Sequence, residues 1–138
     1  MKTSYDVLVV GAGPAGSTAA ERLAADGFDV AVAEEHAVIG EPVDCTGVIG
    51  IEALEAFDLP QGIVVGSVNA VTIHSPDGIP LSYQGDPSLA WIVDRAELDR
   101  TLAKRARDAG ATFLLSTDRK STRLNSSHSD RSRMPSSA

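Results

Sequence analysis

The sequence contains a single cysteine, Cys45, and few aromatic side chains. One cysteine cannot form an intramolecular disulfide, and this indicates a reducing compartment. Aromatic residues make up only 4% of the 138 residues, so alanine, valine, leucine and isoleucine must fill most of the core. No apolar run approaches the ~18 residues of a membrane span, and residues 1–10 leave no room for a signal peptide. We therefore expect a cytoplasmic protein.

The chain carries a formal net charge of −7, which argues against nucleic acid as a partner. The charge is uneven, because residues 1–117 hold seven Lys and Arg against seventeen Asp and Glu, whereas residues 118–138 hold five against two. Residues 118–138 have no periodic pattern of hydrophobic residues and few apolar side chains to bury, so their composition predicts disorder. It is either a basic Ser/Arg tail that binds nucleic acid or is phosphorylated, or non-native read-through sequence, which we favour.

The first forty residues predict a strand, a helix and a second strand. The β-rich run at 5–10 suits a strand buried on both faces, and 28–34 suits another. Between them we expect a helix from Pro14 to Asp26, ended by Gly27. Its predicted apolar stripe consists of Ala15, Ala19, Ala20 and Leu23. The right-handed crossover rule makes the two strands parallel.

A glycine pattern, G-x-G-x-x-G, lies between the first strand and the helix. Gly11 permits a tight turn, Gly13 lets the backbone approach a pyrophosphate, and Gly16 lets helix and strand pack closely. Free N–H groups at the helix N-terminus would face the anion. Glu34, at the end of the second strand, can accept both hydroxyls of an adenosine ribose, and we expect it to be only slightly buried. The pattern predicts a dinucleotide site; the alternative is a glycine turn beside a surface glutamate.

The rest of residues 1–117 predicts a long functional loop, short elements and one further helix–strand pair. Asp94 should cap the helix, with Glu97 completing a capping box. The buried face of that helix should hold Leu98, Leu102, Ala106 and Ala109, and Gly110 should end the helix. The other expected elements are a loop at 36–50, a short helix at 51–57, a hairpin at 70–85 that turns at 76–78, and strands at 89–93 and 111–116.

Three stretches together resemble one group of flavoproteins. "VVGAGPAGSTAAERLAADGFDVAVAEE" is similar to the opening of glutathione-reductase-like and hydroxybenzoate-hydroxylase-like enzymes, supported by Pro14 and Ala15. "IGEPVDCTGVIG" and "VDRAELDRTLAKRARDAGA" resemble the geranylgeranyl reductase family of FAD-dependent oxidoreductases. The resemblance covers residues 5–117. It implies an α/β fold: a truncated, Rossmann-like FAD-binding βαβ domain over 1–117, with a hairpin at about 70–93 belonging to an antiparallel substrate-domain sheet.

The resemblance also implies roles for residues outside the glycine pattern. Cys45 and Thr46 would contact FAD, with Gly40 and Gly47 allowing close approach; the alternative is Cys45 as a small buried hydrophobe. A redox role for Cys45 is disfavoured because no second cysteine is present and no adjacent Lys or Arg lowers its pKa. The family commonly has an acidic residue and glycine soon after this cysteine, where the present chain has Thr46 and Gly47. Arg95 would contact the FAD, or else pair with Glu97 or Asp99.

By the same resemblance, the complete enzyme would reduce C=C bonds of an isoprenoid chain with FAD as cofactor. NAD(P)H or a ferredoxin-type donor would supply electrons, the substrate would be apolar, and a lipid substrate would allow peripheral membrane contact. The alternatives are an aromatic monooxygenase, an electron-transfer flavoprotein to quinone, and an inactive fragment. No catalytic residue is named, because the proton donor would lie beyond residue 117.

Two groups of side chains carry no site in this interpretation. No His, Cys and Asp cluster has metal-ligand spacing, and the three histidines give no convincing site. Tyr83 and Trp91 are expected to pack in a core.

Overall fold

A computed structural model of the chain describes residues 2, 4–85 and 89–117. Strand β1 (Val7–Val10), helix α1 (Pro14–Ala25) and strand β2 (Val30–Ala33) form the predicted βαβ unit, and helix α3 (Arg95–Asp108) with strand β8 (Thr112–Leu114) extends it. The parallel sheet has the order β1-β2-β8. The α/β Rossmann-like fold class is therefore confirmed. The expected tail at 118–138 lies outside the described residues.

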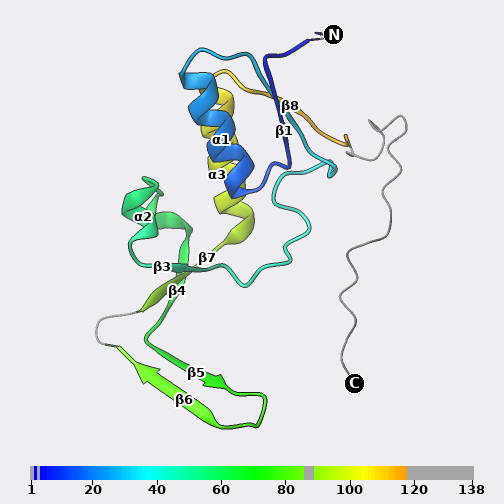
Figure 1. Ribbon diagram of the computed structural model, residues 1–138. Helices are drawn as coiled ribbons and strands as arrows, with labels where there is room; N and C mark the ends of the chain where they lie inside the picture. Colours follow the sequence, from blue (N-terminus) through cyan, green and yellow to red (C-terminus); the bar gives the residue numbers. More distant parts are fainter. Residues whose placement is uncertain (1, 3, 86–88, 118–138) are drawn as a thin grey trace, which may run out of the picture.

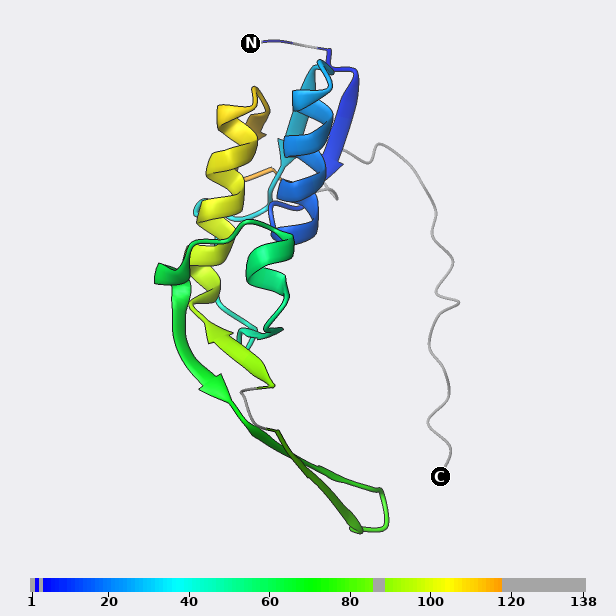
Figure 2. The same ribbon diagram turned by 90° about the vertical axis from the view of Figure 1, so that its left-hand side faces the viewer.

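Both long helices lie on the same side of this sheet and run in the same direction (Figures 1 and 2). Their N-terminal ends consequently meet at one end of the molecule, below the carboxyl ends of the strands in the view of Figure 2. In open α/β sheets, ligands bind in the crevice outside the carboxyl ends of the strands. This arrangement brings the predicted glycine loop and Arg95 to the same end of the fold.

The helix ends follow the sequence closely. Pro14 occupies the first turn of α1, and Gly27 continues the chain after its end with a φ of +91°. At α3, the Asp94 side chain accepts a 3.0 Å hydrogen bond from the Glu97 backbone N–H. The second half of the predicted capping box is absent, because the Asp94 N–H donates to Ile63 O and the Glu97 side chain pairs with Arg100.

The core between the helices and the sheet is built from small side chains. The buried face of α3 holds Leu98, Leu102 and Ala106 as predicted, together with Ala103, while Ala109 is half-buried. On α1 the predicted stripe is partly wrong, because Ala15 and Ala19 are exposed. The residues of α1 buried against α3 and the sheet are Ser17, Ala20 and Ala24.

Strand β1 also differs from expectation, because only one of its faces is covered. Val7 and Val9 pack against the core cluster, whereas Leu8 is 57% and Val10 53% exposed. The two helices cover one side of the sheet, so the other side of this strand meets solvent in the described structure (Figure 2). By contrast, all four residues of β2 are buried between β1 and β8.

A second, antiparallel sheet was only partly foreseen. Strands β3 (Val48–Gly50), β7 (Ala90–Val93) and β4 (Val64–Val68) pair in the order β3-β7-β4, with α2 (Ala53–Ala56) and a 3₁₀ turn at Gln61–Ile63 between them. The sequence pattern predicts a loop where β3 lies and no strand where β4 lies. Both strands are short and contain glycine, and their partner β7 supplies the hydrogen bonds that define them.

The predicted hairpin consists of β5 (Ala70–His74) and β6 (Pro80–Gln84), and it projects from the end of the molecule (Figure 1). One of its faces carries Val71, Ile73, Leu81 and Tyr83, all exposed. The expectation of core packing is therefore wrong for Tyr83, which is 61% exposed. It is confirmed for Trp91, which packs on the cluster around Leu54 and Val93. No helix in the described ranges is long and apolar enough to cross a membrane.

Candidate functional site

The glycine loop has the geometry that its sequence predicts. Gly11 has a φ of +98°, which a side chain would strain. A Cβ on Gly16 would lie 2.0 Å from the Gly11 carbonyl oxygen, so the helix can approach the strand only without one. A Cβ on Gly13 would meet no heavy atom within 4 Å. The space beside Gly13 is therefore open for a ligand to approach the backbone.

The start of α1 offers unpaired donors at this open space. No side chain caps the helix within the described structure, and Pro14 has no N–H. The backbone N–H groups in the first turn of an α-helix have no intrahelical partner, and they carry the positive end of the helix dipole. The loop is braced from inside, because the buried Ser17 hydroxyl donates to Ala12 O at 3.0 Å. The loop is thus a rigid cradle suited to an anion such as a pyrophosphate.

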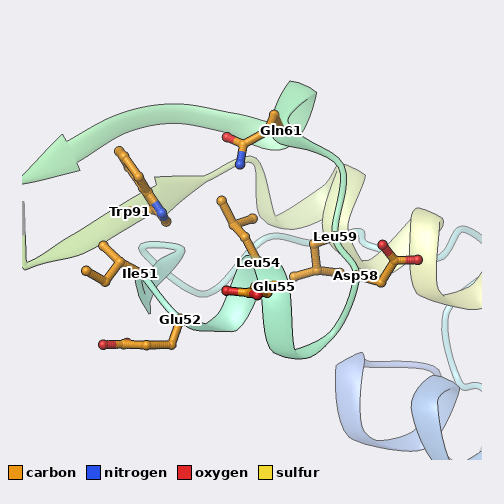
Figure 3. Close-up of a pocket in the computed structure, with 8 residues that line it drawn as sticks. All are labelled: Ile51, Glu52, Leu54, Glu55, Asp58, Leu59, Gln61 and Trp91. Carbon is orange, nitrogen blue, oxygen red and sulfur yellow. The ribbon is translucent and has the colours of Figure 1, made fainter.

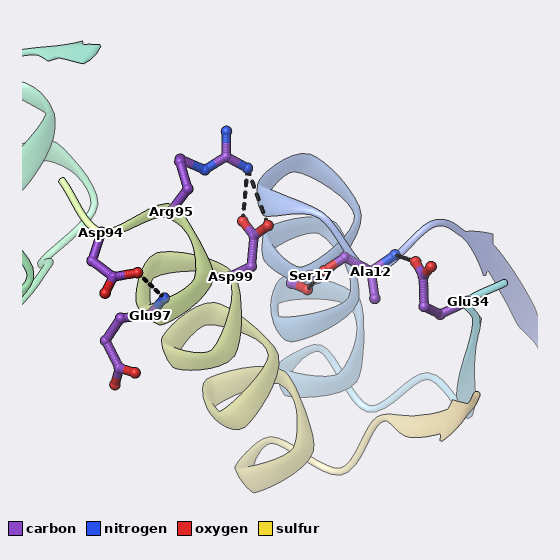
Figure 4. Close-up of polar contacts among 7 residues, drawn as sticks. All are labelled: Ala12, Ser17, Glu34, Asp94, Arg95, Glu97 and Asp99. Carbon is purple, nitrogen blue, oxygen red and sulfur yellow. Dashed lines mark hydrogen bonds and ion pairs between the residues drawn. The ribbon is translucent and has the colours of Figure 1, made fainter. Parts of the chain in front are cut away.

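Glu34 connects this cradle to the end of β2 (Figure 4). Its Oε2 accepts a 2.7 Å hydrogen bond from the Ala12 N–H. Its Oε1 accepts from the His36 backbone N–H at 3.0 Å and from His36 Nδ1 at 2.8 Å. The Glu34 side chain is only 12% exposed. The expectation of slight burial is therefore wrong, because the neighbouring backbone N–H groups turn the carboxylate inward.

These contacts determine the charge state of Glu34. Partial burial works to raise the pKa of this carboxyl group, whereas the hydrogen bonds from the backbones of His36 and Ala12, and then from the His36 ring, lower it. The net pKa of Glu34 lies below its ordinary value. At neutral pH Glu34 is therefore an ionised acceptor, the form that binds hydroxyl groups.

The glycine-rich loop after Glu34 packs tightly on the start of α3. Gly40 and Gly47 both have positive φ values, +82° and +73°. A Cβ on Gly40 would lie 2.8 Å from Ala96 O, and a Cβ on Gly47 would lie 2.2 Å from Val93 O. The close approach that these glycines allow is therefore to the chain's own backbone. This packing fixes Cys45 and Thr46, which are both exposed, beside the first turn of α3.

Arg95 lies in that first turn. One of its guanidinium nitrogens donates to both carboxylate oxygens of Asp99, at 2.9 and 3.1 Å (Figure 4). Arg95 therefore forms a salt bridge with Asp99, one of the two partners expected for it as an alternative to the cofactor. Glu97, the other expected partner, pairs with Arg100. Arg95 Nε is buried and has no hydrogen-bond partner among the described residues. A buried donor without a partner costs stability, so this nitrogen fits an acceptor supplied by a bound group.

The surroundings of Cys45 change the pKa of its thiol. The backbone N–H of Gly47, and then the Arg95 guanidinium, lower the pKa of the Cys45 thiol below its ordinary value. The expectation that no Lys or Arg lowers this pKa is therefore wrong, because Arg95 is distant in sequence but close in the fold. The thiol is also exposed, so it is not the small buried hydrophobe considered as an alternative.

A small cavity of about 200 Å³ is lined by both Gly13 and Glu34, whereas neither Cys45 nor Arg95 lines it. It lies between the glycine loop, the end of β2, the following loop and Asp99 of α3. Four carboxylates line it, from Glu34, Glu35, Glu41 and Asp99, together with one imidazole, from His36. An adenosine ribose is uncharged and donates hydroxyl groups, so it suits an acidic cavity, whereas the 2′-phosphate of NADP would be repelled.

Two larger cavities are also present, and one of them adjoins the start of α1. One, of about 580 Å³, is lined by the apolar side chains of Leu54 and Trp91 and by the carboxylates of Glu52, Glu55 and Asp58, among others (Figure 3). The other, of about 700 Å³, is an apolar groove between α1, α3 and α2, and Pro14, Ala15 and Arg95 are among the residues that line it.

His36 and Ser17 belong to this region although the sequence did not indicate it, and Asp99 was expected only as an alternative partner of Arg95. Ser17 follows the glycine pattern directly, and its burial on the inner face of α1 explains its role. Asp99 lies one helical turn after Arg95, a spacing that favours an ion pair. His36 stands two residues after Glu34, and only the turn at the end of β2 brings its ring to the carboxylate. Within the described ranges no group of three His, Cys, Asp or Glu residues has a metal-binding arrangement.

Comparison with known proteins agrees with this geometry. Residues 9–46 match the model of the NAD(P)-binding Rossmann-like domain. A digeranylgeranylglycerophospholipid reductase of Methanosphaerula palustris is 36% identical over 121 residues, which covers 85% of this chain and 30% of the relative. The chain thus spans about a third of the length of the curated relatives it matches.

Two solved structures share the fold. A geranylgeranyl bacteriochlorophyll reductase-like protein from Thermoplasma acidophilum superposes with a TM-score of 0.70 at 31% identity, over 81% of this chain and 30% of that one. A myxobacterial chondrochloren halogenase, an FAD-dependent halogenase, gives a TM-score of 0.60 at 20% identity, over 81% and 28%. The second match shows the fold alone. Together with the sequence matches, the first confirms the resemblance to the geranylgeranyl reductase family.

Proposed function

We propose, from the confirmed resemblance to geranylgeranyl reductases, that residues 1–117 form the part of an FAD-dependent reductase that binds the adenosine diphosphate half of the cofactor. The observation that carries the proposal is the pairing of Glu34 with the glycine loop. A partly buried, ionised carboxylate accepts a 2.7 Å hydrogen bond from the Ala12 N–H, beside an open approach to Gly13. A dinucleotide needs this combination of an anion cradle and a ribose acceptor.

Different residues would bind different parts of the cofactor. The N–H groups around Gly13, Ala15 and Gly16 would hold the pyrophosphate, with Gly11 shaping the turn and Pro14 starting the helix. Glu34 would accept ribose hydroxyls. Arg95, whose buried Nε lacks a partner in the described structure, would donate to an acceptor on the cofactor. Cys45 and Thr46 would line the cofactor on the side of α3.

FAD would supply the hydride chemistry when bound. The residues described here would bind and orient the cofactor. Glu34 is held ionised, and Arg95 is held by Asp99. The Cys45 thiol, with its lowered pKa, is a reactive group beside the site. We expect it to contact the cofactor rather than to act as a resolving thiol, because the sequence has no second cysteine.

The substrate class of the proposal is the double bond of an isoprenoid lipid chain. The relative from Methanosphaerula palustris is named for a digeranylgeranyl glycerophospholipid, and the protein from Thermoplasma acidophilum for geranylgeranyl bacteriochlorophyll. Both names describe apolar polyisoprenoid groups. The antiparallel strands and the hairpin, with its exposed apolar face, are proposed to belong to the substrate-binding part of such an enzyme. NAD(P)H and a ferredoxin-type protein remain alternative electron donors.

The first experiment measures nucleotide binding and needs no substrate. The 138-residue chain is titrated with ADP by calorimetry, and an affinity of about 10⁻⁴ to 10⁻³ M is expected for the adenosine half alone. Glu34→Gln keeps the shape of the side chain but removes its charge, and should weaken ADP binding about tenfold or more. Glu55→Gln, the same change in α2, is the control and should leave the affinity unchanged. An equal effect of both variants, or none from Glu34→Gln, would remove the basis of the proposal.

A further inference from the structure

The Glu34 carboxylate has fewer free acceptor positions than an adenosine ribose requires. A carboxylate offers about four lone-pair positions. In this structure three are used, by the Ala12 N–H on Oε2 and by the backbone N–H and Nδ1 of His36 on Oε1. One position remains, on Oε2. A ribose that donates both its 2′- and 3′-hydroxyls to Glu34 needs two.

The hydrogen bond from the His36 ring is the one that can be released. The Ala12 and His36 N–H groups belong to the backbone of the glycine loop and of the turn after β2, which further backbone hydrogen bonds hold in place. The His36 side chain, by contrast, is 46% exposed. Its ring can turn into solvent without leaving a cavity in the core. Because Glu34 is ionised and can only accept, Nδ1 must carry the proton in this contact.

We propose that the His36 ring occupies the second ribose acceptor position on Glu34 and must leave it before an adenosine ribose can bind through both hydroxyls. His36 thereby competes with the nucleotide and lowers the affinity of the site. This inference rests on the proposed function, because it concerns the same adenosine site. It assigns to His36 a role in affinity that the glycine pattern and the position of Glu34 do not reveal.

The competition has a limited size. The contact between His36 and Glu34 joins one exposed and one mostly buried side chain. Pairs between two exposed side chains contribute an amount equivalent to about a 1.5- to 5-fold change in an equilibrium constant, and we use this range because the His36 ring is exposed. Removal of the ring should therefore strengthen ADP binding by about 1.5- to 5-fold. The effect should be confined to ligands that use both hydroxyls.

The test compares two variants and two ligands by calorimetry on the 138-residue chain. His36→Ala removes the ring, and His36→Phe keeps an aromatic ring but has no N–H to donate. His74→Ala, a change at the exposed end of β5, is the matched control. ADP carries both hydroxyls, whereas 2′-deoxy-ADP donates only the 3′-hydroxyl, for which the free position on Oε2 is sufficient. Circular dichroism establishes that each variant is folded.

We expect tighter ADP binding by His36→Ala and His36→Phe, unchanged binding of 2′-deoxy-ADP, and no effect of His74→Ala. Unchanged or weaker ADP binding by both His36 variants would overturn the inference while leaving the cofactor site intact. An equal gain with 2′-deoxy-ADP would also overturn it, because the second hydroxyl would then be irrelevant. If neither the wild-type chain nor any variant bound ADP, the proposed function itself would be wrong.

Discussion

Replacing two glycines of the same loop with alanine should separate folding from binding. At Gly16 the new Cβ would lie 2.0 Å from the oxygen and 3.1 Å from the carbon of the Gly11 carbonyl. Both are backbone atoms of a turn with a φ of +98°, so no side-chain rotation relieves the contact. At Gly13 the new Cβ would meet no heavy atom within 4 Å. Gly16→Ala should therefore lower the stability of the fold, whereas Gly13→Ala should weaken ligand binding.

The expected magnitudes follow from these contacts. Alanine gains up to about 1 kcal/mol over glycine within a helix, but overpacking costs about 1–3 kcal/mol. Because the Gly16 contact is with backbone, we expect the upper end of that cost and a net loss of about 2 kcal/mol. For a domain of this size the melting temperature should fall by about 8 °C. Gly13→Ala should cost at most about 1 kcal/mol, the range for a helix N-cap position.

The binding effects should run in the opposite order. The methyl group of Gly13→Ala would project into the space through which a pyrophosphate approaches, so ADP binding should weaken about tenfold or more. Urea unfolding followed by circular dichroism gives the stability of each variant, and calorimetry gives the ADP affinity. This expectation would be refuted by a Gly16→Ala unfolding free energy within about 0.5 kcal/mol of the wild-type value. It would equally be refuted if Gly13→Ala lost as much stability as Gly16→Ala.

Three further predictions concern Cys45, Glu34 and the last residues of the chain. Cys45 should react with a thiol-specific disulfide reagent at neutral pH faster than an ordinary exposed cysteine does. The variant Arg95→Ala should slow this reaction, because Arg95 helps to lower the pKa of the Cys45 thiol. An unchanged reaction rate in the variant would contradict the role of Arg95. Because the folded-state pKa of Glu34 is lowered, its contribution to stability is complete above its ordinary value of 4.5 and is lost as the pH falls through the folded value. The unfolding free energy should therefore decline more steeply below about pH 5 in the wild type than in Glu34→Gln, and parallel curves would argue against the shift. Deleting residues 118–138, which have little to bury by composition, should leave the circular dichroism and melting temperature unaltered, whereas a loss of several degrees would show that they stabilise the body.

The strongly patterned elements could be predicted from the sequence. The start and end of helix α1 can be predicted from Pro14 and Gly27, and those of α3 from the Asp94 cap and the spacing of Leu98 and Leu102. The roles of Gly11 and Gly16 also follow from sequence, because a turn and a close helix–strand contact are local demands on the backbone. In each case residues near one another in the chain determine the outcome.

The remaining features depend on contacts between distant segments. Strand β4 exists through its pairing with β7, and its Gly66 and Ser67 carry no strong strand preference. The Cys45 thiol is influenced by Arg95, fifty residues further along the chain. The missed role of His36 arises from the turn at the end of β2, and the inward position of Glu34 from the Ala12 N–H. None of these contacts leaves a periodic signal in the sequence.

The most direct test of the central claim is an ADP titration of the isotope-labelled chain followed by nuclear magnetic resonance of the backbone amides. If the glycine loop and Glu34 bind the nucleotide, the largest shifts should fall on Ala12, Gly13, Gly16 and His36, and the hairpin β5–β6 should stay unchanged. Largest shifts around Trp91 and Leu54, at the cavity shown in Figure 3, or no shifts at millimolar ADP, would contradict the proposed adenosine site.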